Sequence, residues 1–264
     1  MKGNIKIWLL VLVASLFVFS CTKDPVKPEE EAGNISFEFE HRIDGKAIQF
    51  DTMKYVNAAG NHYLVNEIQY FISDIILHHS NGEKQVLDAW DDIIYIDTDL
   101  EETQFHAFPD EISPGSYHSI TFTFGINEIK NQSLMFVNPP ESFMFWPELL
   151  GGGYHYMKLN GKWLDTLNQV SPYNFHLGIG QVYHSFPDSI TNFIQNYFEV
   201  ELPESTFEIT AGQTLDLTIL MNVENWFQSP NVYNHDVWGG DIMQKQDAMK
   251  LACENGWNVF TLEK

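Results

Sequence analysis

The segment FMFWPELLGGGYHYMKLNG, residues 143–161, combines aromatic, glycine and histidine residues in a way that a plain turn does not need. It contains Trp146, three consecutive glycines and His155. An imidazole on an apolar face must find a hydrogen-bond partner or a metal to offset its desolvation. The segment therefore indicates either the wall of a metal site or an aromatic cluster that closes one end of the fold.

Ten histidines are the remaining candidate ligands for such a site. His41, His118 and His155 each fall in phase with a row of apolar residues, which predicts that all three point into the interior. His176 is out of phase with its apolar neighbours Phe175 and Leu177, so its side chain points to the opposite face from theirs. For any one histidine a hydrogen bond is the simpler role, whereas convergence of several would indicate metal. Four others lie beside turn or polar sequence and are expected on the surface: His62, His78, His79 and His106.

Cysteine contributes little to such a site. Of the two cysteines, Cys21 is expected to carry lipid, and the neighbours of Cys253 are typical of a buried, inert thiol. No intrachain disulfide is then possible. An imidazole site with few or no carboxylates suits copper or zinc, and copper is the stronger binder by the usual divalent order.

The sequence contains none of the common catalytic motifs that we sought, namely GxSxG, GxxxxGK[ST], HExxH, CxxC and the dinucleotide glycine fingerprint. The glycines at 151–153 are followed neither by a helix pattern nor by phosphate-binding basic residues, and they predict a tight bend or a close backbone approach. We therefore expect a binding protein rather than an enzyme.

The chain is strongly acidic, with 36 acidic against 14 basic residues and a formal net charge of −22. A field of this sign repels polyanions, so nucleic acid is not expected as a partner. Cations or cationic protein surfaces are favoured, although the same charge would also keep an exported protein soluble.

The N-terminus has the layout of a secretory signal. Lys2 and Lys6 precede an uncharged apolar run, and the ending VFSC, with its cysteine at position 21, resembles a bacterial lipobox. We expect a signal peptide at 1–20, acylation of Cys21 and a disordered tether at 21–33, because prolines and acids dominate the tether. An uncleaved N-terminal anchor is the alternative. The expected location is the outer membrane, on its periplasmic or cell-surface side.

Residues 34–264 are expected to form one all-β domain, an antiparallel sandwich with Greek-key-like connections and one short C-terminal helix. Ile35, Phe37 and Phe39 alternate with polar residues, as a half-buried strand requires. Residue pairs that are typical of turns lie between the predicted strands, including NG at 160–161.

Two segments near the C-terminus have a less regular pattern. Residues 241–256 predict a helix that Asp241 caps and Asn255-Gly256 ends, and the terminal WNVFTLEK predicts a closing strand. Residues 188–202 fit either a helix that turns into a strand or a strand throughout.

The order FEFEHRIDGK, YFISDIIL, SYHSITFTFGI, MFW…GGYHYMKLNG, NFHLG and ENGWNVFTL resembles the MbnP-like family over residues 35–262. These are exported copper-binding proteins that accompany a di-haem, cytochrome c peroxidase-like partner. The resemblance implies a β-sandwich that binds a single copper, with a tryptophan that the partner oxidises to kynurenine. It assigns that role to Trp146, and it assigns metal binding to His41 and His176.

The sequence departs from the family pattern at one point. Many relatives carry W-x-W, whereas here Trp146 is followed by Pro147-Glu148, and Trp163 is the nearest substitute. His155 occupies a position where relatives often have an apolar residue, and with His118 it is a further candidate ligand.

A second function stays open on the sequence. The chain could be a surface lipoprotein that binds glycan or protein through exposed aromatic residues, with its histidines only structural. The candidate aromatic residues are Trp226, Tyr233 and Trp238.

Overall fold

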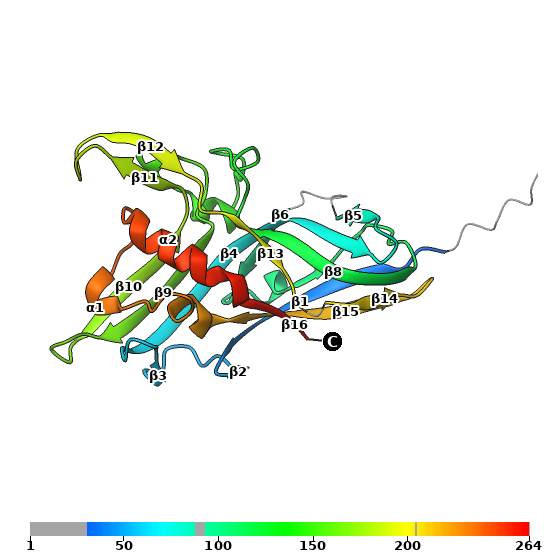
Figure 1. Cartoon of the computed structure of the whole chain (residues 1–264), viewed down its shortest axis with the longest axis horizontal. Coiled ribbons are helices and arrows are strands. Elements are labelled where there is room, and N and C mark those ends of the chain that lie inside the picture. The colour runs from blue at the N-terminus through cyan, green and yellow to red at the C-terminus, as the bar shows by residue number, and fades with distance from the viewer. Residues whose placement is uncertain (1–30, 88–92, 204, 264) are drawn as a thin grey trace, which may run out of the picture.

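The computed structural model describes residues 31–87, 93–203 and 205–263 (Figure 1). The predicted signal peptide, Cys21 and most of the predicted tether lie outside these residues. Strands dominate, most of them antiparallel, which confirms the predicted all-β sandwich. No helix in the described part of the chain has the length and apolar character needed to cross a membrane.

One sheet is built around β1 (Asn34–Ile43), whose residues Ile35, Phe37 and Phe39 are buried as their alternation predicts. β1 and β15 pair in parallel over their whole shared length, an exception to the predicted antiparallel order. The other strands of this sheet are β2 (Lys46–Ala47), β7 (Phe105–Ala107), β15 (Thr214–Asn222) and β16 (Phe260–Glu263).

The second sheet is built around β4 (His62–His79), which pairs with β9 along its first half and with β8 along its second half. Its main path runs β10-β9-β4-β8-β13, and the shorter strands attach to β4 or β8. Its other strands are β3 (Tyr55–Val56), β5 (Lys84–Val86), β6 (Ile93–Asp97), β8 (Gly115–Phe124), β9 (Met157–Leu164), β10 (Val170–Leu177), β13 (Phe198–Glu201) and β14 (Phe207–Ile209).

Aromatic rings join the two sheets across the main core. Phe260 of β16 lies 5.3 Å from Phe122 of β8 and 6.1 Å from Tyr70 of β4, measured between ring centroids. Tyr70 in turn lies 5.7 Å from the ring of His41 on β1. Pairs of aromatic side chains contribute about 0.5–1.5 kcal/mol each beyond the area that they bury.

The outer face of the second sheet has an interior of its own. Phe71 alternates with the inward-facing Tyr70, yet it is fully buried. Residues 125–156, which we call the cover, fold back over this face and bury it. The small cluster around Phe71 consists of Tyr95, Ile126, Met144 and Tyr154.

The helical segments are short. α2 (Gln246–Asn255) ends at Gly256, as predicted, but Asp241 does not cap it: this carboxylate accepts a hydrogen bond from the Met243 amide in a turn ahead of the helix, and the cap position is Lys245. The other helices are α1 (His235–Trp238), η1 (Glu101–Thr103), η2 (Glu141–Met144), η3 (Glu148–Leu150), η4 (Val223–Phe227) and η5 (Gly256–Asn258).

The ambiguous segment 188–202 contains no helix. It forms β12 (Ile190–Ile194) and then β13, and β12 pairs with β11 (Gly180–Tyr183) in a two-stranded arm at the upper left of Figure 1. The predicted closing strand is β16.

His235, which the sequence did not single out, is fully buried inside a box of aromatic rings. The centroids of Tyr173, Tyr233 and Phe227 lie 4.5, 5.1 and 5.3 Å from that of His235. Neither of its ring nitrogens has a hydrogen-bond partner within the described chain. Burial lowers the pKa of His235 to about 3, so the ring is neutral in the folded protein at physiological pH.

We predict that His235→Phe raises the free energy of unfolding by about 1–3 kcal/mol at pH 7, because it removes two unsatisfied buried nitrogens. The gain should grow as the pH falls from 6.5, the ordinary pKa, towards the folded pKa of about 3. In this interval the unfolded wild type binds a proton that the folded state does not, which costs about 1.4 kcal/mol per pH unit. Urea unfolding at pH 7 and pH 5 measures both effects.

The matched control is His62→Phe, which changes an exposed histidine and removes no buried, unsatisfied nitrogen, so it should not give the stability gain expected at pH 7. A His235→Phe protein that is less stable than the wild type at both pH values would contradict the prediction.

Candidate metal-binding site

Trp146 belongs to the cover, and its side chain is fully buried in the main core. Its indole N–H donates to the Leu150 carbonyl at 3.1 Å. Its ring lies against Gly178, where a Cβ atom would come within 2.6 Å of the indole, so only glycine fits there. The tight bend predicted at Gly151, Gly152 and Gly153 is confirmed, since their φ angles are 122°, 72° and 73° and such values favour glycine.

The structure brings His155 and His176 together beside Trp146. The two imidazole centroids lie 5.0 Å apart with their planes at 85°, and the indole lies 4.6 Å from His155. Two imidazoles that share one ion through bonds of about 2.0–2.1 Å have centroids roughly 5–6 Å apart. The pair is therefore spaced to hold one ion.

A backbone carbonyl selects the tautomer of His155. Its Nδ1 lies 2.8 Å from the Met144 oxygen, and because a carbonyl only accepts, Nδ1 carries the proton. Nε2 is then a lone-pair donor, and it is buried without a hydrogen-bond partner. Burial, with smaller contributions from His176 and Lys158, lowers the pKa of His155 well below its ordinary value. The ring is thus neutral and has one free lone pair.

Two polar residues select the tautomer of His176. The Glu67 carboxylate accepts from Asn160 Nδ2 at 2.6 Å, which turns the Asn160 oxygen towards His176 Nε2 at 2.7 Å. An amide oxygen only accepts, so Nε2 carries the proton and Nδ1 the lone pair. Nδ1 is buried and unpartnered. Burial, and then Lys158, lower the pKa of His176 to about 3.

The charge around this pair favours a monovalent ion. Lys158 is the direct cross-strand neighbour of His176, and it lowers the pKa of both histidines, whereas no carboxylate contributes to either shift. An ammonium group repels a dication about twice as strongly as a monocation at the same distance.

In the described residues no three His, Cys, Asp or Glu side chains gather around one point, so the site offers few ligands.

The structure does not bring His41 to this pair. Met157 pairs with both Tyr70 and Leu177, so the three side chains lie on the same, inner face of the second sheet. His41 contacts Tyr70 from β1 and therefore lies on this inner side as well. His176 precedes Leu177, so it leaves β10 on the opposite, outer face. His41 instead lines a cleft of about 420 Å³ together with Glu38, Glu40 and Glu101.

His118 also lies elsewhere, because a β-bulge reverses its phase. The register places His78 opposite Ser119 but His79 opposite Tyr117, so His118 is the extra residue. Tyr117 is buried in its place and His118 is exposed. The prediction that His118 shares a buried row with the apolar residues after it is therefore wrong.

Sequence reasoning missed the residues that hold the imidazoles. The NG pair at 160–161 predicted a turn, but both residues lie inside β9, and Asn160 is the partner of His176. Gly161 is required there because the Tyr173 hydroxyl and the Leu64 carbonyl come within 2.4 and 2.2 Å of where its Cβ would be. Only the cross-strand register could have revealed these contacts.

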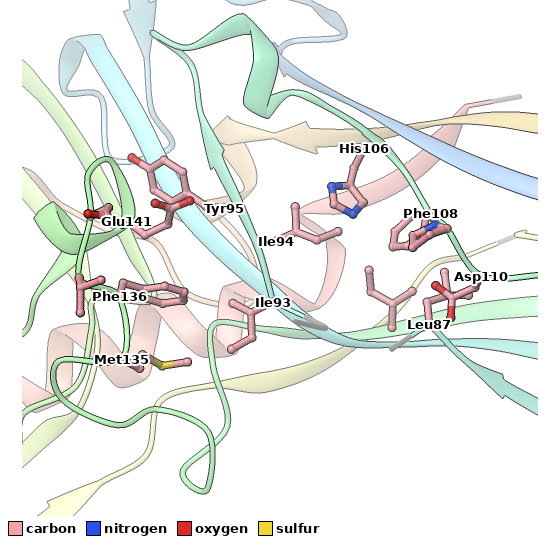
Figure 2. Close-up of a pocket in the computed structure, with 14 residues that line it drawn as sticks. Leu87, Ile93, Ile94, Tyr95, His106, Phe108, Asp110, Met135, Phe136 and Glu141 are labelled. Atoms are coloured by element: carbon pink, nitrogen blue, oxygen red, sulfur yellow. The ribbon is translucent and has the colours of Figure 1, made fainter. Parts of the chain in front are cut away.

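A separate cleft of about 340 Å³ is lined by β6 and part of the cover (Figure 2). Figure 2 shows Tyr95 and Glu141 at one end and His106 and Asp110 at the other. His106 is the one histidine among its lining residues, which include neither Trp146 nor the imidazole pair. This cleft is not part of the candidate metal site.

Comparisons with known proteins agree with the fold. The family model described as MbnP matches residues 32–244. Among solved structures, MbnP from Methylosinus trichosporium is similar, with a TM-score of 0.51 and 13% identity over 77% of this chain and 80% of that chain. At this identity the likeness concerns the fold alone. A search of curated proteins gave no match.

We predict that nitrogen NMR of the metal-free protein finds His155 protonated on Nδ1 and His176 on Nε2. Because burial depresses both pKa values, neither ring should titrate between pH 8 and pH 5. Titration of either buried ring near pH 6.5 would show that the pair is solvated.

Proposed function

The chain belongs to the MbnP family, whose model matches most of its length, and we propose that it is an exported protein that binds a single copper ion with His155 and His176. Membership of this family associates the chain with copper. The observation that carries the proposal is the pair of buried, unpartnered nitrogens, His155 Nε2 and His176 Nδ1, on adjacent rings beside Trp146. We propose binding in copper acquisition or handling rather than catalysis.

Each neighbour of the pair has a definite part in this proposal. The Met144 carbonyl and Asn160 hold the two rings so that their lone pairs stay free, and such supporting contacts typically change metal affinity about 10–100-fold. Lys158 disfavours a divalent ion, so cuprous copper is the expected form. The indole of Trp146 excludes water on one side, and its π-system also attracts cations.

The ligand set of this proposal is smaller than the set that the sequence offered. His41 lies on the inner face of the sandwich and His118 on the surface, so neither is included. In this proposal His155 is the second ligand, at a position where relatives often have an apolar residue. The expected donors are thus two neutral imidazole nitrogens.

Trp146 is the residue for which we propose oxidation to kynurenine by a di-haem, cytochrome c peroxidase-like partner. In this reaction the indole C2–C3 bond breaks, water supplies the oxygen atoms, C2 leaves as formate, and the electrons and protons that are released pass to the haem partner and to solvent. Kynurenine has a carbonyl and an amine where indole has only a donor N–H, so the product would add a weak ligand beside the imidazoles. Because Trp146 is fully buried, the partner would withdraw electrons through intervening groups rather than by contact with the indole.

Lipid attachment at Cys21 would place this site at the outer membrane, on its periplasmic or cell-surface side. This part of the proposal rests on the sequence of the first 21 residues alone. It matches the acidic surface charge, which suits an exported protein that meets cations.

The alternative function, glycan or protein binding through exposed aromatic residues, finds less support. Trp226 and Tyr233, two of the residues that it relied on, are 0% and 1% exposed and belong to the main core. Trp238 is only half-buried, but Trp226 and Tyr233 are not at the surface to form a binding surface with it.

We predict that His155→Ala and His176→Ala each weaken binding of cuprous copper at least about 100-fold, because one ligand of a two-ligand chelate is lost. Competition with a coloured cuprous chelator measures the affinity, and circular dichroism verifies folding. His41→Phe and His62→Ala should bind as the wild type does, since neither residue touches the pair. Equal affinity in all four variants would exclude this pair as the copper site.

Intact mass of the protein isolated from its native host tests the proposed modification. We expect the small mass increase of a tryptophan-to-kynurenine conversion, located at Trp146 by peptide mapping, and its absence from Trp146→Phe. An unmodified mass in copper-loaded native protein would contradict the kynurenine step and leave the imidazole site standing.

A further inference from the structure

The bulge that excludes His118 from the core places it beside a second imidazole on the outer face of the second sheet. The ring centroids of His118 on β8 and His78 on β4 lie 5.8 Å apart, with their planes tilted by 54°. This separation falls in the range of roughly 5–6 Å for two imidazoles on one metal ion. His118 is exposed and His78 half-buried, so an ion could reach both from solvent.

The two rings stand on neighbouring strands of the sheet that pair with each other. His78 Nε2 lies 2.8 Å from the hydroxyl of Thr121, the outward-facing residue of β8 two positions beyond Ser119. A hydroxyl both donates and accepts, so this contact is compatible with either tautomer of His78. The two imidazoles are therefore already close before any ligand arrives, which reduces the ordering cost of binding.

The charged neighbours of this pair differ from those of the buried pair. Glu201 and Glu199 on β13 attract positive charge at His78, while Lys84, opposite His78 on β5, and His118 repel it. At the buried pair Lys158 lowers the pKa of both histidines, and no carboxylate contributes to either shift. The repulsion from Lys84 is the larger of these effects, so the choice of ion at the surface pair rests on its imidazole ligands, which suit a borderline divalent ion.

We propose that His78 and His118 form a second metal site, at the surface, for a divalent borderline ion such as Cu²⁺ or Zn²⁺. In the described residues no third His, Cys, Asp or Glu side chain completes the group, so water fills the remaining positions. The site is independent of the buried pair and of any modification of Trp146. In the usual order of affinity among divalent metal ions, Cu²⁺ binds such a site most tightly.

Titration calorimetry of the full chain with Zn²⁺ alone tests this proposal. His78→Ala and His118→Ala should each weaken one binding event at least about tenfold, because two imidazoles on one rigid sheet act as a chelate. His62→Ala removes an exposed histidine on the same strand as His78, and it should leave that event unchanged. The event should persist in the His155→Ala/His176→Ala double variant, which separates it from the buried site.

A second measurement does not depend on the variants. Addition of Zn²⁺ should move the side-chain nitrogen resonances of His78 and His118 together, at one equivalence point. The proposal is overturned if His78→Ala and His118→Ala bind Zn²⁺ as the wild type does. It is also overturned if His62→Ala weakens binding equally, or if the two resonances shift independently of each other.

Discussion

Two hydrogen bonds, from His155 Nδ1 to the Met144 carbonyl and between His176 Nε2 and the Asn160 amide, determine what the buried site can bind. Each bond occupies one nitrogen of a neutral imidazole and leaves the lone pair of the other nitrogen without a partner. A buried polar group left unsatisfied costs about 1–3 kcal/mol. Coordination of a metal ion removes that cost for both rings at once, which is why the arrangement is informative about function.

The fold supplies the burial that this chemistry needs. A sandwich of two sheets would leave the outer face of the second sheet in water, and His176 would then be an ordinary surface histidine. The cover changes this, because Met144 and Tyr154 pack around Phe71 on that face and the same stretch of chain carries Trp146 and His155. The glycines at 151–153 permit the turn that brings Trp146 and His155 together. The cover therefore encloses the two imidazoles on the outer side of the second sheet, while the indole of Trp146 beside them belongs to the main core.

Sequence periodicity predicted the main core well and the site only in part. Alternation placed Phe37 and Phe39 correctly, because β1 runs without interruption. It failed at His118, where one extra residue reverses the phase. At His155 it predicted burial correctly but on the wrong face: β9 begins only at Met157, and the chain before it belongs to the cover.

Other residues of the site depend on contacts that a single sequence does not reveal. Asn160 and its partner Glu67 lie far apart in the chain, and they meet because β4 and β9 pair in one particular register. His235 carried no periodic signal, since it begins a four-residue helix between irregular segments. The cluster of aromatic residues and glycines around Trp146 is visible in the sequence, but the role of Trp146 in the site came from the resemblance to the MbnP-like family.

X-ray absorption at the copper edge of the cuprous-loaded full chain tests whether His155 and His176 bind the copper ion. We predict a first shell that contains two imidazole nitrogens and no sulfur, and the loss of one imidazole in His155→Ala and in His176→Ala. A first shell with sulfur from Cys253 or a methionine, or a spectrum that neither substitution changes, would contradict it.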